Sequence, residues 1–405
     1  LQHIRDKMAG IVAFAFAYIL SQFYRSFLAV LTPALTSELG ASKADLSLAS
    51  GAWFIAFALM QFIVGVSLDR FGPRRTASIM LAAGAGGGAL LFSLASAPWM
   101  IVAAMTLIGI GCSPVLMAPL FIFAKTYSPV RFAVLTSWFV GIGTLGNVLG
   151  AAPLAAAAEL FGWRPVMAGL GAVTLAVAAA LYLIVRDPPP DAEAAGGSTG
   201  FSGYLELMRL KVLWPVIPLT AINYAPPIGI RGLWAGPFLT DMHGADTLMI
   251  GNVTLFMALG MVAGSFVYGP LDTVFRTRKW VVIAGNAICL AAIVFLALFP
   301  AASLMAAATA LVVIGITGAS YGMLMAHARA FFPRHLTGRG VTLMNFFAIG
   351  GVGLMQFATG GVVSAATSPQ QPAAAYVALF AFYALTLGGA FVIYLFSRDA
   401  APERG

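Results

Sequence analysis

Residues 8–35 read MAGIVAFAFAYILSQFYRSFLAVLTPAL, an almost unbroken apolar run that carries one arginine, Arg25, near its middle. About 20 apolar residues are enough for a helix to cross the hydrocarbon layer of a membrane. A guanidinium at that depth costs at least about 2.5–3.5 kcal/mol, and it does not escape this cost by losing its proton. We therefore expect Arg25 to face a water-filled cavity and an anionic ligand that compensates its charge.

The composition places the whole chain in a membrane. Of its 405 residues, 60% are hydrophobic and 9% are charged, whereas a soluble domain carries about 25% charged residues. The net charge of +8 is typical of cytoplasmic loops in such a chain and does not indicate nucleic-acid binding. Cys112 and Cys289 both lie in apolar runs and indicate neither a disulfide framework nor a metal site, so we expect no cofactor.

Twelve apolar runs predict an all-α membrane protein with twelve transmembrane helices. The runs cover residues 8–35, 45–68, 76–96, 98–123, 132–157, 164–185, 213–239, 247–271, 280–299, 302–326, 340–365 and 373–396. One connection is long and rich in Pro, Gly, Ser and Ala, which marks a flexible linker. We expect an N-terminal six-helix bundle over residues 1–186, a cytoplasmic linker over 187–211 and a C-terminal six-helix bundle over 212–405.

The basic residues predict the orientation of these helices. When the loops alternate between two sides, Lys43 and Arg164 fall on one side and Arg25 and Arg231 within the membrane. The other 18 of the 22 Lys and Arg residues fall on the second side, and such enrichment is typical of cytoplasmic loops. We therefore expect a multi-pass protein of a bacterial-type inner membrane, with both termini cytoplasmic. We also expect it to be a monomer surrounded by lipid.

The two halves of the chain repeat weakly. Asp69 after the second run corresponds to Asp272 after the eighth, and Arg25 in the first run corresponds to Arg231 in the seventh. Transporters built from internal repeats hold their substrate near the membrane midplane, where the repeats meet. The repeat therefore predicts that Arg25 and Arg231 face each other from the two halves.

The loop after the second run reads GVSLDRFGPRR over residues 65–75, and a degenerate copy follows the eighth run, from Gly269 to Lys279. This loop resembles G-x-x-x-D-R-x-G-x-R-R, the signature of the major facilitator superfamily. With the six-plus-six arrangement, the resemblance covers essentially the whole chain. It implies two pseudo-symmetric six-helix bundles that rock around a central cavity and so give alternating access.

Within that superfamily, one arginine in the first helix and another in the seventh is similar to the organic-anion and organophosphate:phosphate exchanger branch. The resemblance implies that Arg25 and Arg231 hold the anionic group of a substrate. That branch uses further His and Lys side chains in its site, and this sequence places none of them in mid-membrane. A small carboxylate is therefore the expected substrate, with an organophosphate, phosphate or nitrate as alternatives.

The signature loop and its copy also predict a conformational latch. Its candidate residues are Asp69, Arg70, Arg74, Arg75, Asp272 and Arg278. Charge-assisted hydrogen bonds from such groups to neighbouring helix ends can hold one conformation and must break for another. The alternative interpretation is that these charges only anchor the loops at the cytoplasmic surface.

Further polar and aromatic residues near the two arginines complete a candidate binding site. They are Tyr18, Gln22, Tyr24, Tyr224, Trp234, Tyr321 and Asn345. Each has an ordinary alternative, because amides and tyrosines also hydrogen-bond helices to one another in lipid. In the seventh run, Pro226, Pro227 and Gly229 precede Arg231, and we expect a break in the helix that aims this arginine at the cavity.

The acidic residues argue against a proton relay. All 14 Asp and Glu residues fall in loops or at the ends of the runs, and the four His are terminal or near run ends. Proton-driven carriers usually place such groups within the membrane. We therefore expect an exchanger or a uniporter, and symport in which the substrate itself carries the proton stays open. The alternatives are an efflux permease for amphiphilic compounds and a non-transporting anion sensor, and no nucleophile–base pair in the sequence indicates an enzyme.

Overall fold

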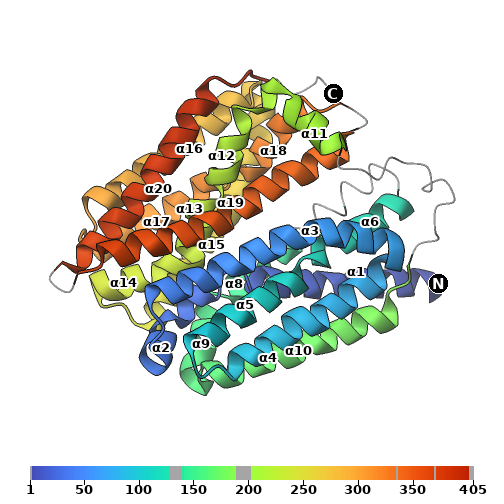
Figure 1. Ribbon diagram of the computed structural model, residues 1–405, viewed down its shortest axis with the longest axis horizontal. Helices are drawn as coiled ribbons and strands as arrows, with labels where there is room; N and C mark the ends of the chain where they lie inside the picture. The colour runs from blue at the N-terminus through green and yellow to red at the C-terminus, as the bar shows by residue number, and fades with distance from the viewer. Residues whose placement is uncertain are drawn as a thin grey trace. The chain divides into compact units, whose positions relative to one another are not determined.

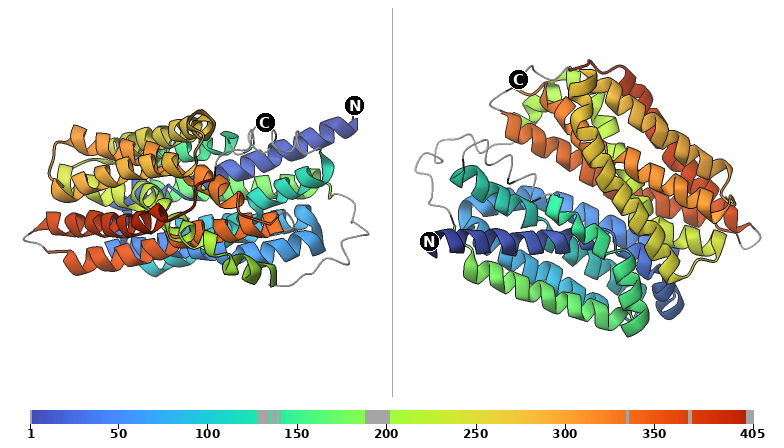
Figure 2. Two further views of the ribbon diagram at one scale, coloured as in Figure 1. Left: turned by 90° about the horizontal axis from the view of Figure 1, so that it is seen from above. Right: turned by 180° about the vertical axis from the view of Figure 1, so that it is seen from behind.

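The structure is a computed structural model, and it describes residues 2–127, 135, 139, 141–187, 202–333, 336–368 and 371–400. The chain divides into two compact units, Leu1–Gly197 and Ser198–Gly405. Throughout the described residues every regular element is a helix, and within each unit the helices run side by side (Figures 1 and 2). The all-α architecture that the sequence predicts is therefore confirmed.

The N-terminal unit begins with two helices that meet at a bend and continues through long helices to α10. Its elements are α1 (Gln2–Phe23), α2 (Leu28–Leu39), α3 (Lys43–Met80), the π-helix η1 (Leu81–Gly86), α4 (Gly87–Ser93), α5 (Pro98–Cys112), α6 (Pro114–Thr126), α8 (Leu145–Leu149), α9 (Ala152–Phe161) and α10 (Trp163–Ile184). α3 begins with a capping box, in which Asp45 N donates to Ser42 Oγ at 3.1 Å and Ser42 N donates to Asp45 Oδ2 at 2.9 Å.

The C-terminal unit contains a run of short helices followed by long ones. Its elements are α11 (Ser202–Arg209), the 3₁₀ helix η3 (Lys211–Leu213), α12 (Val216–Asn223), α13 (Ala225–Gly229), the π-helix η4 (Ile230–Trp234), α14 (Ala235–His243), α15 (Thr247–Phe275), α16 (Lys279–Leu298), α17 (Leu304–Gly318), α18 (Tyr321–Arg329), α19 (Thr337–Ala366) and α20 (Pro372–Leu395). Residues 188–201 of the predicted linker lie outside the described residues, and the last part of that linker forms α11 and the start of η3.

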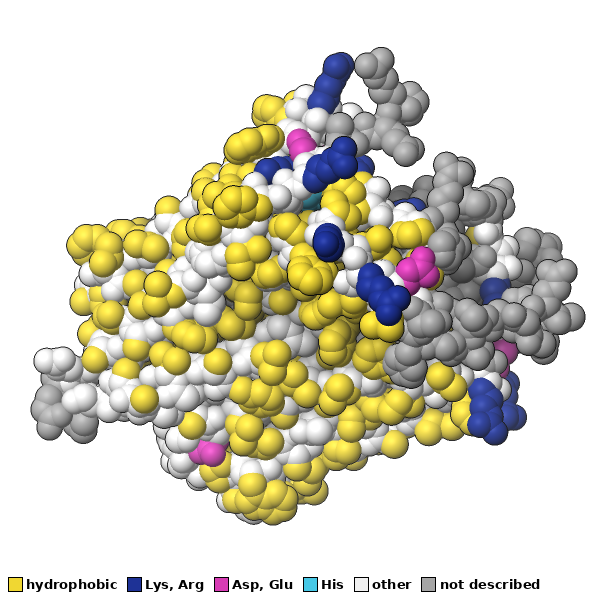
Figure 3. Space-filling model, turned by 45° about the horizontal axis from the view of Figure 1, so that its top comes forward, with side chains coloured by type: hydrophobic (Ala, Val, Ile, Leu, Met, Phe, Trp, Pro, Cys, Tyr) yellow, Lys and Arg dark blue, Asp and Glu magenta, His cyan; other side chains and the backbone are white. Residues whose placement is uncertain are grey.

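The described helices overlap the spans expected from the sequence, and most of residues 132–140 of the predicted run 132–157 lie outside the described residues. Among the described residues, ten helices are long and apolar enough to cross a membrane, and the bent pair Met8–Phe23 and Leu28–Leu39 makes eleven if it counts as one span. The remaining predicted run, 213–239, is the broken series from α12 to α14. On the face shown in Figure 3 hydrophobic side chains predominate, as expected of a surface that contacts lipid.

The predicted signature loop lies inside α3, where Gly72 forms a kink that separates two helical segments. Gly72 has φ 80° and ψ 161°, a backbone conformation that is essentially restricted to glycine. Pro73 then starts the second helix, and Arg74 N donates to the Asp187 carboxylate at 2.7 Å. A Cβ at Gly72 would lie within 2.6–2.8 Å of that same carboxylate. Backbone conformation and close packing therefore both require glycine here.

We expect Gly72→Ala to destabilise the protein by about 1–3 kcal/mol, because alanine would adopt a disfavoured conformation and collide with Asp187. The measurement is the apparent melting temperature of the purified protein in detergent. Gly65→Ala is the matched control, since Gly65 lies in the same helix with nothing within 4 Å of its would-be Cβ. Equal melting temperatures for Gly72→Ala and the unchanged protein would contradict this account.

Candidate functional site

Arg25 lies at a break in the first predicted span. α1 ends at Phe23, α2 begins at Leu28, and the chain bends by 52° between them. The turn interrupts the helical hydrogen bonds, and the Ser26 hydroxyl donates to the Phe23 carbonyl oxygen at 3.3 Å. Broken helices often form binding sites in carriers, because irregular backbone is tolerated at membrane depth only where it is buried in protein or lines a cavity.

An aromatic platform on α3 holds the Arg25 guanidinium. Its Cζ atom lies 4.9 Å from the ring centroid of Phe57 and 5.4 Å from that of Trp53. The two rings stack with centroids 5.1 Å apart, because residues four apart share one face of a helix. A cation–π contact of this kind contributes about 0.5–2 kcal/mol and engages the face of the guanidinium. The buried Nε of Arg25 has no hydrogen-bond partner among the described residues.

Trp53 and Phe57 are not among the binding-site residues expected from the sequence. The available signal is their spacing of four within the second run, which places two large aromatic rings on one helical face. That spacing is equally typical of an ordinary packing face. Only the structure shows that this face is turned toward Arg25.

Three predicted neighbours of Arg25 come from α1 and its end. Gln22 Nε2 donates to the Tyr18 hydroxyl at 2.7 Å, and the Tyr18 ring stacks on Phe139 with centroids 5.3 Å apart. The fully buried Tyr24 instead places its hydroxyl 2.9 Å from Thr174 Oγ1 on α10. Because that hydroxyl already has a partner in the helix packing, we leave Tyr24 out of the proposed binding set.

Arg231 lies in the broken seventh span, within the π-helix η4. Pro226 and Pro227 are at the start of α13, where their missing N–H groups interrupt the preceding helix. π-helical turns inside a span are frequent at functional sites. Arg231 is only 1% exposed, so its charge is enclosed by protein to a greater degree than that of the half-buried Arg25.

Gly229 allows two polar side chains to approach the segment that carries Arg231. A Cβ at Gly229 would lie 2.5 Å from the Tyr383 hydroxyl and 2.9 Å from Gln356 Nε2. Both side chains are buried, and they come from α20 and α19 respectively. Neither Tyr383 nor Gln356 is among the site residues expected from the sequence. The available signals were Gly229 in the seventh run and single polar side chains in otherwise apolar runs.

Trp234 fixes the end of η4 against α19. Its Nε1 donates to Thr359 Oγ1 at 3.0 Å, and the Thr359 hydroxyl in turn donates to the Gln356 carbonyl oxygen at 3.0 Å. The Trp234 side chain is fully buried. Because the only donor of the indole is already used, we assign Trp234 a positioning role for η4 rather than a contact with a ligand.

The structure brings together the three remaining predicted residues of the C-terminal unit. The rings of Tyr224 and Tyr321 lie 5.4 Å apart between centroids, and the Tyr321 hydroxyl donates to Asn345 Oδ1 at 2.8 Å. All three side chains are half-buried. Tyr224 lies at the break between α12 and α13, and Tyr321 directly follows the break between α17 and α18. These residues form a polar cluster that a ligand with hydroxyl groups could contact.

A second, fully buried network lies next to this cluster along the chain. Asn223 Nδ2 donates to Asn286 Oδ1 at 2.6 Å and to Ser320 Oγ at 3.0 Å. Asn223 and Ser320 directly precede Tyr224 and Tyr321, so the network holds the two broken spans and α16 together. The sequence analysis did not predict it.

The predicted latch residues of the N-terminal unit contact the end of α10. The Arg74 backbone donates to Asp187, and the Arg74 Cζ atom lies 5.0 Å from the ring centroid of Tyr182. Arg70 lies over the ring of Phe71, with Cζ 5.4 Å from its centroid. Arg75 is exposed, and the side chain of Asp69 lies outside the described residues.

In the C-terminal unit, the other two latch residues pair with each other. Arg278 Nε lies 3.1 Å from Asp272 Oδ2, and Arg278 Nη1 donates to the Ala326 carbonyl oxygen at 3.4 Å. The pair therefore ties the loop after α15 to α18. A role of these residues in switching conformation stays a prediction.

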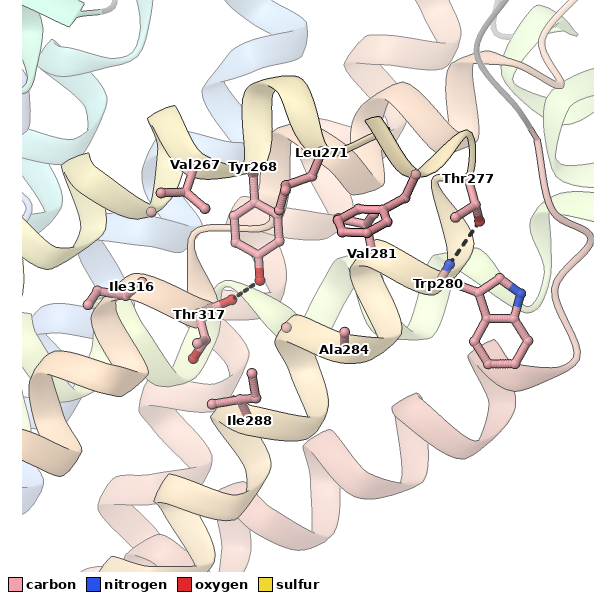
Figure 4. A pocket seen from close by; sticks show the side chains of 13 residues that line it. Val267, Tyr268, Leu271, Thr277, Trp280, Val281, Ala284, Ile288, Ile316 and Thr317 are labelled. Atoms are coloured by element: carbon pink, nitrogen blue, oxygen red, sulfur yellow. Dashed lines mark hydrogen bonds between the residues drawn. The ribbon is translucent and has the colours of Figure 1, made fainter. Parts of the chain in front are cut away.

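A separate cavity of about 480 Å³ lies between α15, α16 and α17. Its walls are mainly apolar (Figure 4), and none of the residues that line it is a predicted site residue. The predicted residues instead gather at broken helices, around Arg25 in one unit and around Arg231 and Tyr224 in the other.

The chain belongs to the Major Facilitator Superfamily, which its residues 14–230 match. It is 24% identical over 312 residues to a probable L-galactonate transporter of Escherichia coli strain K12, covering 69% of this chain and 66% of that protein. It is 23% identical over 284 residues to a hexuronate transporter of Bacillus subtilis strain 168, covering 65% of this chain and 64% of that protein. The alignments thus span less than two-thirds of either relative.

The fold is similar to that of a crystallised bacterial homolog of the human lysosomal transporter Spinster. The two structures agree with a TM-score of 0.77 at 20% sequence identity, over 97% of each chain. The twelve-helix major facilitator fold expected from the sequence is confirmed. The family and the two relatives are membrane transporters and not enzymes.

We expect a double-mutant cycle to detect the aromatic platform. Arg25→Gln and Phe57→Leu should be coupled by about 0.5–2 kcal/mol in the unfolding free energy, because each change removes the same cation–π contact. Phe54→Leu is the matched control, since Phe54 packs edge-on against Trp53, with centroids 4.8 Å apart, and makes no cation–π contact with Arg25. Strictly additive effects of Arg25→Gln and Phe57→Leu would contradict the contact.

Proposed function

We propose that the chain is a secondary transporter that moves a small organic carboxylate across the membrane by alternating access. The observation that carries this proposal is the Arg25 guanidinium, which lies at a broken helix against two aromatic rings and has a buried Nε with no hydrogen-bond partner among the described residues. A permanent charge in this setting is costly unless an oxyanion neutralises it. The two oxygens of a carboxylate match the guanidinium fork.

Arg231 supplies the second positive charge of the proposed site, from the C-terminal unit. Its enclosure in η4, beside the polar side chains that approach Gly229, supports a role in which the charge is held at a fixed place. A fixed cation with no anion bound is poorly compensated away from bulk water, which disfavours reorientation of the empty carrier. This behaviour is that of an exchanger, although a uniporter would use the same residues.

The relatives support a hydroxylated carboxylate as the substrate. L-Galactonate and the hexuronates are sugar acids, each with one carboxylate and several hydroxyl groups. Hydroxyl groups are recognised by hydrogen-bond donors and acceptors rather than by charge. The half-buried cluster of Tyr224, Tyr321 and Asn345 offers such groups, as does the pair of Tyr18 and Gln22. A sugar acid is therefore the proposed substrate. The proposed location of the transporter is a bacterial-type inner membrane.

We expect Arg25→Gln and Arg231→Gln each to weaken sugar-acid binding by at least about tenfold, because each change removes a charge-assisted hydrogen bond. The affinity of Arg25→Lys should fall between that of the unchanged protein and that of Arg25→Gln, because lysine keeps the positive charge and lacks the two-pronged guanidinium. The measurements are ligand-induced thermal shift and counterflow in proteoliposomes with D-glucuronate, D-galacturonate and L-galactonate. Phosphate, nitrate and neutral D-glucose complete the panel.

Arg209→Gln is the matched control, because Arg209 is an exposed arginine at the end of α11. It should bind and exchange sugar acids as the unchanged protein does. Full response of both Arg25→Gln and Arg231→Gln to every anion would remove the basis of the proposed site. Equal exchange of D-glucose and D-glucuronate would also contradict it.

A further inference from the structure

One tyrosine, Tyr268, crosses from α15 to α17 and lines the cavity between α15, α16 and α17. The Tyr268 hydroxyl donates to the Thr317 carbonyl oxygen at 2.8 Å. Gly285 on α16 allows this, because a Cβ there would lie 1.6 Å from the Tyr268 hydroxyl oxygen. The small side chain of Ala284 leaves the neighbouring space open (Figure 4). The Tyr268 ring thus lies among all three helices and forms one wall of the volume beside it.

The walls of this cavity suit a hydrocarbon chain. The Tyr268 hydroxyl is already bonded inside the unit, so that the lining is mainly carbon. Val267 and Ile288 are 54% and 53% exposed, which places the opening on the outer surface of these two spans. That surface faces lipid in a membrane. The volume lies within the range of about 300–1,000 Å³ that is typical of ligand sites.

The mouth of the cavity carries a cation, Arg276, that has no polar partner within the described part of the chain. Lys279 donates to the Leu395 and Ser397 carbonyl oxygens at 2.7 and 2.8 Å, and Arg278 pairs with Asp272. Arg276, between the lining residues Phe275 and Thr277, is exposed and makes no hydrogen bond or ion pair with any residue that the structure describes.

Trp280 indicates where the opening of the cavity lies relative to the membrane surface. It lines the cavity and is 59% exposed. Tryptophan is enriched at the level of lipid headgroups, where its apolar ring and its N–H group are both satisfied. The turn at residues 275–280 therefore lies at the membrane surface, on the side that the basic residues predict to be cytoplasmic.

We propose that this cavity binds an anionic phospholipid, with one acyl chain between α15, α16 and α17 and the phosphate at Arg276 beside Trp280. The apolar volume, its opening toward lipid and the exposed arginine at its mouth each match one part of such a molecule. The site lies wholly within the C-terminal unit and contains none of the residues assigned to the transported anion. The proposal therefore goes beyond the transport function and does not depend on it.

The test uses the full chain, stripped of lipid in neutral detergent and titrated with dioleoylphosphatidylglycerol or dioleoylphosphatidylcholine. Native mass spectrometry gives the affinity of the first bound lipid. A phosphatidylglycerol with a diazirine in its acyl chain then reports the place of binding by crosslinking. We expect roughly fivefold tighter binding of phosphatidylglycerol, since one surface cation near a lipid headgroup has about that effect, and crosslinks within residues 264–288.

Two variants separate the parts of the proposal. Ala284→Phe fills the cavity from an exposed lining position and should abolish binding of both lipids, whereas Ala287→Phe, on an exposed part of the same helix outside the cavity, should not. Arg276→Asn should remove only the preference for phosphatidylglycerol. Asparagine suits the left-handed backbone of Arg276, which has φ 54°. Arg329→Asn, an exposed arginine at the end of α18, is the charge control.

Equal affinity of the unchanged protein for the two lipids would overturn the assignment of the phosphate to Arg276. Crosslinks outside residues 264–288, or undiminished lipid binding by Ala284→Phe, would overturn the assignment of the cavity. If Ala284→Phe fails to fold, as judged by its melting temperature, the charge preference of Arg276→Asn and the crosslink positions in the unchanged protein still decide the question.

Discussion

The contact between the Arg25 guanidinium and the stacked rings of Phe57 and Trp53 is the interaction on which the proposed anion site depends. A charge far from bulk water needs a favourable partner, and an acidic residue would cancel the charge that an anion requires. Aromatic faces attract the cation and leave its net charge intact. The bend after Phe23 and the aromatic spacing on α3 both serve this arrangement. The aromatic contact is therefore compatible with the proposed role of Arg25 in binding an anion.

The two units use corresponding arginines in different surroundings. Arg25 is half-buried in a turn, whereas Arg231 is enclosed in a π-helix whose end is fixed by the hydrogen bond from Trp234 to Thr359. Hydroxyl and amide groups cluster in the C-terminal unit, around Tyr321 and Asn345. The internal repeat thus places an arginine at the corresponding position of each half, while the packing of each unit determines which side chains surround it. The proposed sugar-acid cargo, with one charged end and many hydroxyl groups, is chemically compatible with these two kinds of surroundings.

The spans and the position of both arginines could be read from the sequence, because lipid forces backbone groups into helices and makes long apolar runs distinctive. The break at Pro226 was also predictable, since proline lacks an N–H group. The rotation of a side chain about its helix was not, and so Tyr24 lies against Thr174 and the face carrying Phe57 is turned toward Arg25. Contacts between distant segments, such as that of Asn223 with Asn286, leave no local pattern in the sequence.

The carboxylate of Asp187 has a consequence for dividing this protein into two polypeptides. It lies three residues after the end of α10, yet it accepts the backbone N–H of Arg74 and occupies the space that Gly72 leaves free. Asp187, the last described residue before the connecting segment, thus completes the turn between the second and third spans. An N-terminal half ending at residue 186 would expose that turn to water, whereas one ending a few residues later would keep it intact. An N-terminal polypeptide should therefore include Asp187 and not stop at the end of α10.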